Sequence, residues 1–496
     1  MHIRIIPLVL IFVYLIVAAG CDKEEFTQDP NDRINISLDT LSFDTVFTEQ
    51  ATVTRLFKIY NPHDRSIQLS RVYVKGGASS GFRLNVDGFP GTDLKNILLP
   101  PKDSIYVFVA LTLDPVGGDL PLVVYDAIVF EYNGTESQIT LEAFGQDVFL
   151  IRGMLPESAT WTAGKPYLIY RNLVIDTDQT LTIEAGARIY LHYNSSIVVY
   201  GKLIVDGTHV APVTFEGDRF DRGYAESAGR WGTIIFQPGS TGNLIRYAII
   251  KNAQAGLQVG IPGEFEVQPS VVLHNTLIQN SSFSSILAFG AQIEAYNCIF
   301  ADAQYYGLIL LMGGEYNFFH SSISIYGALE KNVYETKYKR GNPSNALFLS
   351  NWYPYYVLNE YYLVEEKTAN IELVSANFIN SIVYGNNKLE LNKDDNEQTA
   401  FNFQFENCIL KLVEDSVEAY GSEFFKEVIL NKDPRFVNDS ILLGPMDFRL
   451  DTLSPAIDAG SLVRVNEHLP YLQFDYNGND RTLDGKPDLG AFERQE

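Results

Sequence analysis

The sequence predicts an all-β protein in which a right-handed parallel β-helix follows a small β-sandwich. Apolar and polar residues alternate in short runs through residues 34–149, with turn residues between the runs. Residues 150–450 repeat one short motif at steps that mostly span 22–28 residues. Aromatic residues make up 13% of the chain, and their side chains fit a pleated surface.

Residues 1–20 read as an export signal. Arg4 precedes an uncharged, mostly apolar stretch that is short for a membrane span and ends in small residues before Cys21. The run Ala18-Ala19-Gly20-Cys21 resembles the lipobox of bacterial lipoproteins, with Ala18 at the usual leucine position. The resemblance implies that Cys21 carries acyl chains and anchors the protein to a membrane. The alternative is an ordinary secretory signal followed by an incidental cysteine.

Residues 21–33 are polar and without apolar periodicity, so they predict a flexible tether. The cluster Asp22-Lys23-Glu24-Glu25 resembles the export signal of surface lipoproteins in gut-type Gram-negative bacteria. The enteric sorting rule opposes this, because Asp directly after the cysteine favours the inner membrane. We expect the outer membrane and the cell surface. The 37 basic and 61 acidic residues give a net charge of −24, which argues against nucleic-acid binding.

About seven strands are expected in residues 34–149. Phe57-Lys58-Ile59-Tyr60 stops at Asn61-Pro62, and a hairpin turn is expected at Asn133-Gly134. This region resembles the immunoglobulin-like modules that precede β-helices in secreted bacterial proteins. The resemblance implies a spacer or partner-binding module.

The repeat is a four-residue unit with a polar or aromatic first position, a small second position and Ile or Leu at the third. It occurs at Tyr247-Ala248-Ile249-Ile250, Asn275-Thr276-Leu277-Ile278, Asn297-Cys298-Ile299-Phe300, Ser321-Ser322-Ile323-Ser324, Asn380-Ser381-Ile382-Val383 and Asn407-Cys408-Ile409-Leu410. Such units predict stacked rungs, in which the third position forms an inward ladder and the asparagine amides bond to one another at a corner. The long step between Ser321 and Asn380 predicts one further rung, with a strand at Asn345 to Ser350, and an insertion at about 328–374.

The opening of this region strengthens the assignment. The phrases TLTIEAGARIYLH, GKLIVDGT, APVTFEGDR and RWGTIIF resemble the first coils of pectin-lyase-like β-helix lipoproteins. The span predicts about ten rungs in a rod roughly 45–50 Å long. Cys298 and Cys408 share one register at least three rungs apart, so both are expected to be free and buried.

Residues 451–496 resemble the choice-of-anchor Q-like modules that close secreted bacterial β-helices. The match includes Pro455-Ala456-Ile457-Asp458-Ala459-Gly460 and Gly490-Ala491-Phe492-Glu493. A solenoid must cover its last rung, so we expect this segment to cap the end of the helix. Asp475, Arg481 and Asp488 are expected to pair and tie it down.

Known chemistry is not encoded in a recognisable motif. The chain lacks the Gly-His-Gly and Arg-Ile-Lys runs of polygalacturonase-type hydrolases. The stretch from Asp475 to Asp480 begins like a calcium loop, but position six is Asp480 and position twelve is Lys486. His192, His274 and His320 lie near strand ends without metal spacing. We expect no metal and no cofactor.

Two segments are candidate sites. Glu216, Asp218 and Asp221 lie in a dense charged loop, which is either a carboxylate site or a solvated loop whose charges pair with one another. Trp352, Tyr353, Tyr355 and Tyr356 belong to an aromatic insertion, whose rings either stack on sugars or cover the side of the helix.

Two functions remain open at this stage. The first is a surface protein that binds glycan or another envelope component, with the lipid anchor holding it to the membrane. The second is a polysaccharide lyase or glycoside hydrolase acting on acidic polysaccharide, which the β-helix fold alone supports only weakly.

Overall fold

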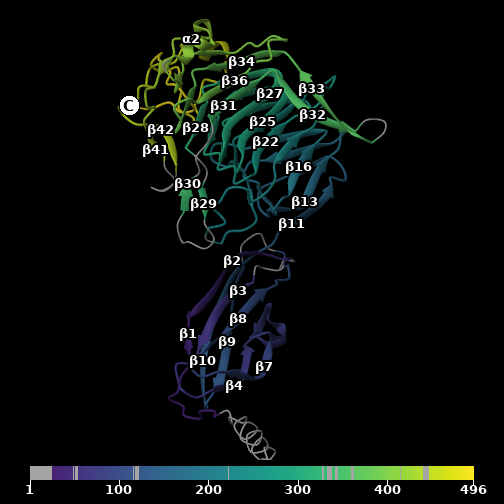
Figure 1. Cartoon of the computed structure of the whole chain (residues 1–496), viewed down its shortest axis with the longest axis vertical. Coiled ribbons are helices and arrows are strands. Elements are labelled where there is room, and N and C mark those ends of the chain that lie inside the picture. The colour runs from purple at the N-terminus through teal and green to yellow at the C-terminus, as the bar shows by residue number, and fades with distance from the viewer. Residues whose placement is uncertain are drawn as a thin grey trace, which may run out of the picture. The chain divides into compact units, whose positions relative to one another are not determined.

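A computed structural model describes residues 25–48, 50, 54–115, 117, 122–221, 223–326, 345–358, 362–413, 415–439 and 446–495, and the backbone of 329–331 and 338–340 (Figure 1). The predicted signal peptide and Cys21 lie outside these residues. The chain divides into two compact units, residues 1–147 and 148–496. Among the described residues, no helix is both long and apolar enough to span a membrane.

The first unit is a β-sandwich. One sheet has the order β1 (Asn35–Ile36), β3 (Arg55–Tyr60), β8 (Ser104–Leu111), β5 (Phe82–Val86) and β6 (Phe89–Gly91). The other has the order β2 (Thr40–Phe47), β10 (Thr135–Gln146), β9 (Leu122–Tyr132), β4 (Ile67–Val74) and β7 (Asp93–Leu99). A short 3-10 helix, η1 (Gly77–Ser79), joins β4 to β5. Alternate residues of the strands, such as Phe57 and Ile59, fill the core between the sheets. The described residues form ten strands where about seven were expected; two of the ten, β1 and β6, are too short to show an alternating pattern.

The second unit is a right-handed parallel β-helix with three faces, named here in the order in which each rung runs through them. The first face contains β11 (Phe149–Met154) and β13 (Tyr167–Ile175) in their first halves, then β15 (Arg188–Leu191), β18 (Val213–Gly217), β21 (Ala248–Lys251), β24 (Leu277–Gln279), β26 (Ile299–Ala301), β28 (Ser322–Ile325), β35 (Ile382–Gly385), β38 (Ile409–Leu410) and β40 (Ile429–Leu430). Ten successive pairings of parallel strands give this face a length of about 48 Å.

The second face contains the second halves of β11 and β13, then β16 (Ser196–Val199), β19 (Ile234–Phe236), β22 (Ala255–Val259), the first halves of β25 (Ser284–Tyr296) and β27 (Tyr306–Phe319), β31 (Asn345–Ser350) and β36 (Leu391–Asp394). The third face contains β12 (Ala159–Trp161), β14 (Thr180–Glu184), β17 (Lys202–Asp206), β20 (Asn243–Arg246), β23 (Ser270–His274), the second halves of β25 and β27, β34 (Leu373–Ile379), β37 (Gln404–Glu406) and β39 (Phe425–Lys426).

Three corners join the faces. The asparagine corner, from the third face to the first, holds Tyr247, Asn275, Asn297, His320, Asn380 and Asn407, all with φ between 44° and 53°. Asparagine tolerates this left-handed backbone better than most residues. The loop corner joins the first face to the second, and the hairpin corner joins the second face to the third.

The third position of the repeat unit was expected to point into the helix, but the fourth position does so in the structure. On the first face, Leu410 and Phe300 point into the helix core, whereas Ile409 and Ile299 at the third position point outward. In the His320 rung the unit also begins one residue earlier than predicted, because Ile299 pairs with Ser322. Both positions are apolar because both sides of these strands are buried.

The outward isoleucines are covered by the C-terminal segment. Ile299, Ile382 and Ile409 pack in one cluster with Ala456, Phe492 and other residues from 436–492. This segment contains the two-stranded sheet of β41 (Phe436–Asn438) and β42 (Asp447–Leu450) and the helix α3 (Leu462–Glu467). It therefore covers a side of the helix, and the expectation that it caps the end is wrong.

The end of the helix is closed by another segment. Val417 and Tyr420 of α2 (Ser416–Tyr420) and Phe424 of η2 (Ser422–Phe424) pack against the main core cluster. These two short helices precede β39 and β40, the last strands of the parallel sheet. The predicted boundary at residue 450 thus falls after the last rung, which ends at Leu430.

The long step between Ser321 and Asn380 is one rung with two insertions. β28 pairs directly with β35, so the further rung that was expected there is absent. β31 at Asn345–Ser350 is a strand of the second face, as predicted. One insertion, at the loop corner, contains β29 (Leu329–Lys331) and β30 (Tyr338–Arg340); the other, at the hairpin corner, contains β32 (Trp352–Leu358) and β33 (Val364–Asn370).

Both remaining cysteines match the prediction. Cys298 and Cys408 are free and fully buried, and both point into the core. They are three rungs apart, as expected.

Candidate functional site

The two predicted candidate segments lie on opposite edges of the second face. The charged loop follows β18 and enters β19, at the loop corner. The aromatic insertion follows β31 and enters β34, at the hairpin corner four rungs later. Four strand spacings put them about 19 Å apart along the helix axis.

The three carboxylates of the loop form separate pairs. Glu216 on β18 bonds Lys251 on the next rung, with 2.6 Å between Oε2 and Nζ. Asp218 accepts a hydrogen bond from Nδ1 of His192 on the preceding rung at 2.6 Å. Asp221 binds Arg219 through two hydrogen bonds of 3.0 and 2.9 Å. Among the described residues, no group of three His, Cys, Asp or Glu side chains is arranged to hold a metal ion.

The same loop gathers cations on an aromatic ring that sequence reasoning did not single out. The guanidinium carbon of Arg219 lies 3.5 Å from the ring centre of Tyr224, and that of Arg230 lies 4.7 Å from it. Burial lowers the pKa of Arg230, and repulsion from Arg219 acts in the same direction. Arg222 lies outside the described residues.

A row of aromatic rings follows the loop corner and continues onto the second face. Phe283 and Tyr305 occupy the same turn position on successive rungs, with their ring centres 6.2 Å apart, and both are exposed. Tyr306 lies 6.3 Å from Phe283 and 6.2 Å from Phe348, which follows on the next rung. These four residues do not stand out in the sequence, because they are spread over three rungs and only Tyr305 and Tyr306 are adjacent.

The aromatic hairpin presents two different sides. Tyr353 and Tyr355 face the helix and pack with Phe289, Ile309 and Leu311 on the outer surface of the second face. The ring of Tyr353 meets that of Phe289 edge to face at 5.2 Å. Because side chains alternate along a strand, Trp352 and Tyr356 belong to the opposite side, where Tyr356 is 67% exposed. Two of the predicted glycan-binding residues thus cover the helix, and two are left on the outer side.

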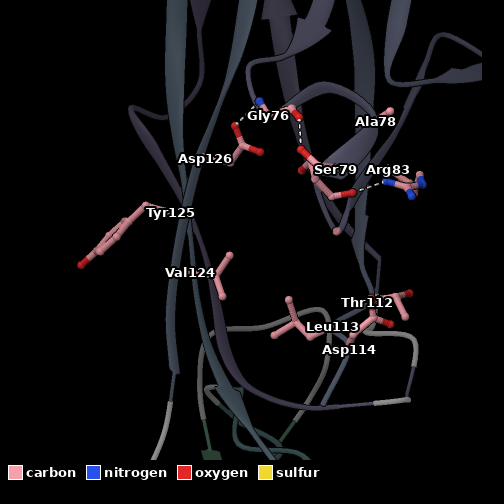
Figure 2. Close-up of a pocket in the computed structure, with 12 residues that line it drawn as sticks. Gly76, Ala78, Ser79, Arg83, Thr112, Leu113, Asp114, Val124, Tyr125 and Asp126 are labelled. Carbon is pink, nitrogen blue, oxygen red and sulfur yellow. Dashed lines mark hydrogen bonds between the residues drawn. The ribbon is translucent and has the colours of Figure 1, made fainter. Parts of the chain in front are cut away.

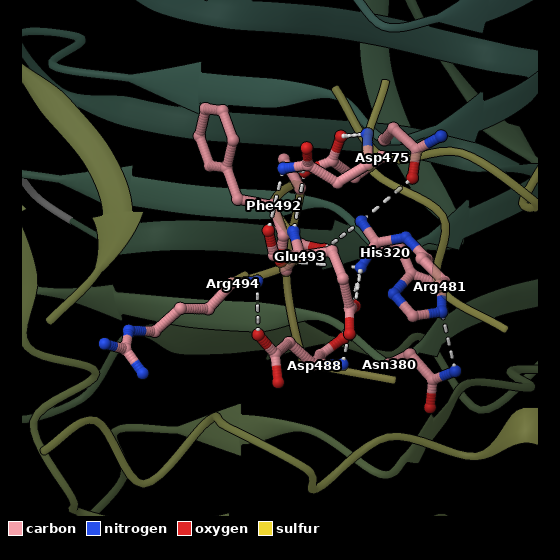
Figure 3. A network of polar contacts seen from close by, with 12 residues as sticks. His320, Asn380, Asp475, Arg481, Asp488, Phe492, Glu493 and Arg494 are labelled. Carbon is pink, nitrogen blue, oxygen red and sulfur yellow. Dashed lines mark hydrogen bonds and ion pairs between the residues drawn. The ribbon is translucent and has the colours of Figure 1, made fainter. Parts of the chain in front are cut away.

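The C-terminal segment contains a buried polar network (Figure 3). Arg481 is fully buried, and its ion pair is with Glu493 at 3.0 Å. Asp475 instead accepts hydrogen bonds from the backbone N–H groups of Asn477, Asn479 and Glu493, at 2.7–2.8 Å. The carboxylate of Asp488 likewise accepts two backbone hydrogen bonds, at 2.7 and 2.8 Å. The three predicted residues therefore lie in one network, and Glu493 supplies the direct partner of the arginine.

That network also holds the segment to the asparagine corner. Arg481 donates to Oδ1 of Asn297 at 3.1 Å, and Asn380 donates to the backbone oxygen of Ser461 at 3.1 Å. His320 is fully buried beside Asn380, and burial lowers its pKa well below the usual value. The corner amides thus bond mainly to the covering segment, rather than only to one another as predicted.

The sandwich contains a pocket of about 560 Å³ (Figure 2). Arg83 in its wall donates to the backbone oxygen of Ser80 at 2.6 Å, and Asp126 accepts from the backbone N–H of Gly76 at 2.9 Å. Both charged groups hold the loop around η1 in place, so the polar groups of this pocket serve the fold of the sandwich.

The solved structures with distant similarity to the chain include two glycoside hydrolases. No family profile matches the chain, and no curated protein matches it either. A family 123 glycoside hydrolase from Clostridium perfringens, studied for glycolipid glycan hydrolysis, aligns with 24% of this chain at 5% identity and a TM-score of 0.18; the chain spans 26% of its length. The catalytic unit of a GH87 α-1,3-glucanase from Streptomyces thermodiastaticus strain HF3-3 aligns at 10% identity and a TM-score of 0.22. The alignment covers 71% of this chain and 78% of the glucanase chain. Both similarities are too distant to assign a function.

Proposed function

We propose that this chain is a lipid-anchored protein of the outer membrane surface whose β-helix binds glycan, or another envelope component, through exposed aromatic rings. The observation that carries the proposal is the row formed by Phe283, Tyr305, Tyr306 and Phe348. Flat rings with apolar faces stack on the C–H faces of sugars. A row along the axis of stacked strands presents such rings at regular intervals to an extended chain.

Two further features support this reading. Phe283 and Tyr305 are exposed, whereas Tyr306 and Phe348 are half-buried, and neighbouring exposed apolar side chains often mark an interaction site. The outer side of the aromatic hairpin adds Trp352 and Tyr356 beyond the far edge of the same face. A ligand that followed the second face would therefore meet rings at both of its edges.

The test is retention of the purified full chain on immobilised glycans and on a glycan array. Replacing Tyr305 by Ala is expected to weaken binding about tenfold, since one stacked ring is lost. Tyr200→Ala is the matched control, because Tyr200 is a similarly exposed tyrosine at the hairpin corner. Equal retention of both variants and the wild type would refute the aromatic row as the binding surface.

The lipid anchor has its own test. Cells that express the chain and are fed an alkyne-tagged fatty acid should label the wild type but not Cys21→Ser. Protease treatment of intact cells should then degrade the labelled protein if it faces outward. Labelling of Cys21→Ser would show that another residue carries the anchor, and an unlabelled wild type would show that no residue does.

A second candidate function is cleavage of acidic polysaccharide. One observation favours it: the imidazole of His192 is hydrogen-bonded to Asp218, which is the arrangement of a general base oriented by a carboxylate. His192 is partly exposed and stacks on Tyr170 at 4.2 Å. Incubation of the full chain with uronate-rich polymers should yield new reducing ends or unsaturated products, which His192→Ala should abolish. Without any product, binding alone would stand.

A further inference from the structure

The loop of residues 223–230 is held firmly against the loop corner. Asn252 donates to the backbone oxygen of Ala225 at 2.6 Å, and Asn280 on the next rung donates to that of Glu226 at 3.0 Å. The N–H of Arg230 donates to the backbone oxygen of Asn252 at 2.7 Å. Trp231, which follows, is fully buried. The groups that this loop carries are therefore positioned in advance of any ligand.

Two guanidinium groups at the loop corner, those of Arg219 and Arg230, have one carboxylate nearby, that of Asp221. Arg219 and Arg230 both lie over the ring of Tyr224. Asp221 uses both of its oxygens to bind Arg219. Arg230 is left with a cation–π contact and with no ion pair or side-chain hydrogen bond among the described residues, and its Nε is shielded from solvent.

Other arginines of this unit that are at least partly buried find polar partners. Arg219, Arg464 and Arg481 each have a carboxylate within 3.0 Å, and Arg188 donates to the backbone oxygen of Gly164. The whole chain carries a net charge of −24, so carboxylates are abundant. Shielding a cation from water without an anion costs free energy. An external anion would remove this cost.

We propose that Arg230, together with Arg219 and Tyr224, forms a binding site for a planar oxyanion, above all a carboxylate. A guanidinium presents two parallel N–H donors that match the two oxygens of such a group. The tyrosine ring holds the guanidinium planes in place. Arg219 adds a second positive charge close by.

The position of the site suggests what would carry the oxyanion. Gly229 lies against the side chain of Ser282, the residue before Phe283. A glycan on the aromatic row would thus extend toward Arg230 and place an acidic substituent on it. This extension to an acidic glycan rests on the proposed function, whereas the oxyanion site does not.

The experiment is isothermal titration of the full chain with sodium glucuronate, sodium sulfate and sodium phosphate at constant ionic strength, with glucose as the uncharged counterpart. The wild type should bind glucuronate saturably and glucose not. Arg230→Gln should weaken binding about tenfold or more, because a bidentate charged contact is lost. Arg246→Gln is the matched control, since it removes one exposed arginine that is paired with Asp206. Preference for the tetrahedral anions sulfate or phosphate over glucuronate would contradict a site for a planar carboxylate.

Several outcomes would overturn the proposal. The wild type could fail to bind any of the three anions, or Arg230→Gln could bind glucuronate as well as the wild type and Arg246→Gln do. If Arg230→Gln does not fold, Arg230→Lys replaces it as the test variant, because lysine keeps the charge but lacks the paired N–H donors of a guanidinium. Its affinity for glucuronate should fall several-fold. Unchanged affinity would refute the site.

The two proposals fail separately. Tyr305→Ala should bind glucuronate normally even if it no longer retains glycan. Glycan binding that is insensitive both to the charge of the glycan and to Arg230→Gln would refute the extension to an acidic glycan and leave the aromatic row standing. Glucuronate binding without any glycan binding would refute the aromatic row and leave the oxyanion site standing.

Discussion

The side-chain amide of Asn275 donates a hydrogen bond of 2.9 Å to the backbone oxygen of Asp475, two hundred residues later in the chain. Asn297, on the next rung, does the same with the backbone oxygen of Phe474 at 2.9 Å. The asparagine corner is thus a row of amides that binds the backbone of the C-terminal segment. The left-handed backbone at each corner residue, which turns the chain from the third face to the first, also places its side chain toward that segment.

Replacing Asn297 by Ala should loosen this attachment. The change leaves the oxygen of Phe474 and the buried guanidinium of Arg481 each short of one partner and places Ala at a φ of 53°. We expect the free energy of unfolding to fall by about 3 kcal/mol. Tryptophan fluorescence measures it, because all three tryptophans lie in the helix unit.

Asn297→Gly separates the two causes. Glycine relieves the left-handed strain but also lacks the amide, so this variant should recover about 1 kcal/mol of the loss. Full recovery in Asn297→Gly would mean that the amide contributes nothing to holding the segment.

The outward isoleucines give a second prediction. Ile409→Ala should cost about 2–4 kcal/mol, because Ile409 is fully buried beneath the C-terminal segment. Ile249 occupies the same position of the repeat but is half-buried and outside that cluster. Ile249→Ala should therefore cost less than about 1 kcal/mol. If chemical unfolding gives equal losses of stability for Ile409→Ala and Ile249→Ala, the C-terminal segment does not cover Ile409 as the structure shows.

The sequence predicts the β-helix because stacking requires each rung to repeat the one before it. It does not predict which way a strand faces when neighbouring residues such as Ile409 and Leu410 are both apolar. Alternation reveals orientation only when one side of a strand meets water. Here the outer side of the strand packs against a segment that lies far along the chain, and no local sequence pattern predicts that contact.

The candidate sites show the same limit. The sequence identifies the charged loop and the aromatic insertion, since both are dense clusters. It cannot show that Arg481 pairs with Glu493 while Asp475 binds backbone N–H groups, because any of several carboxylates could reach the arginine. Nor can it show that Arg230 has no ion pair with a described residue, which depends on where Asp221 points.

Glu390 makes the stability of the helix depend on pH. It is fully buried beside β31, where its oxygens accept from the N–H groups of Ala346 at 2.8 Å and Asn387 at 2.6 Å. Burial raises its pKa from 4.5 to about 7, against these hydrogen bonds. Between these values the folded state holds a proton that the unfolded state has lost. The free energy of unfolding should therefore fall as the pH rises from about 4.5 to 7, by up to about 3 kcal/mol from this group.

Glu390→Gln should remove that pH dependence, measured as the difference in thermal midpoint from the wild type at several pH values. Glu406 is the control of opposite sign, because hydrogen bonds from Arg464 lower its pKa. Glu406→Gln should thus lose more stability at pH 7 than at pH 4. If the Glu390→Gln and wild-type midpoints run parallel across the window, the buried proton is not on Glu390.

The two sides of the aromatic hairpin should respond differently to substitution. Tyr353 packs on Phe289, so Tyr353→Ala should lower the free energy of unfolding by about 2–3 kcal/mol. Tyr356 is 67% exposed on the other side, so Tyr356→Ala should leave stability within about 0.5 kcal/mol of the wild type and reduce retention on glycan gels. Tyr125→Ala in the sandwich, at 66% exposure, is the matched control for the loss of an exposed ring. Retention that falls equally in Tyr125→Ala and Tyr356→Ala would show that the gel retains the protein through any exposed aromatic ring. Unchanged retention in Tyr356→Ala would confine glycan binding to the row at the loop corner.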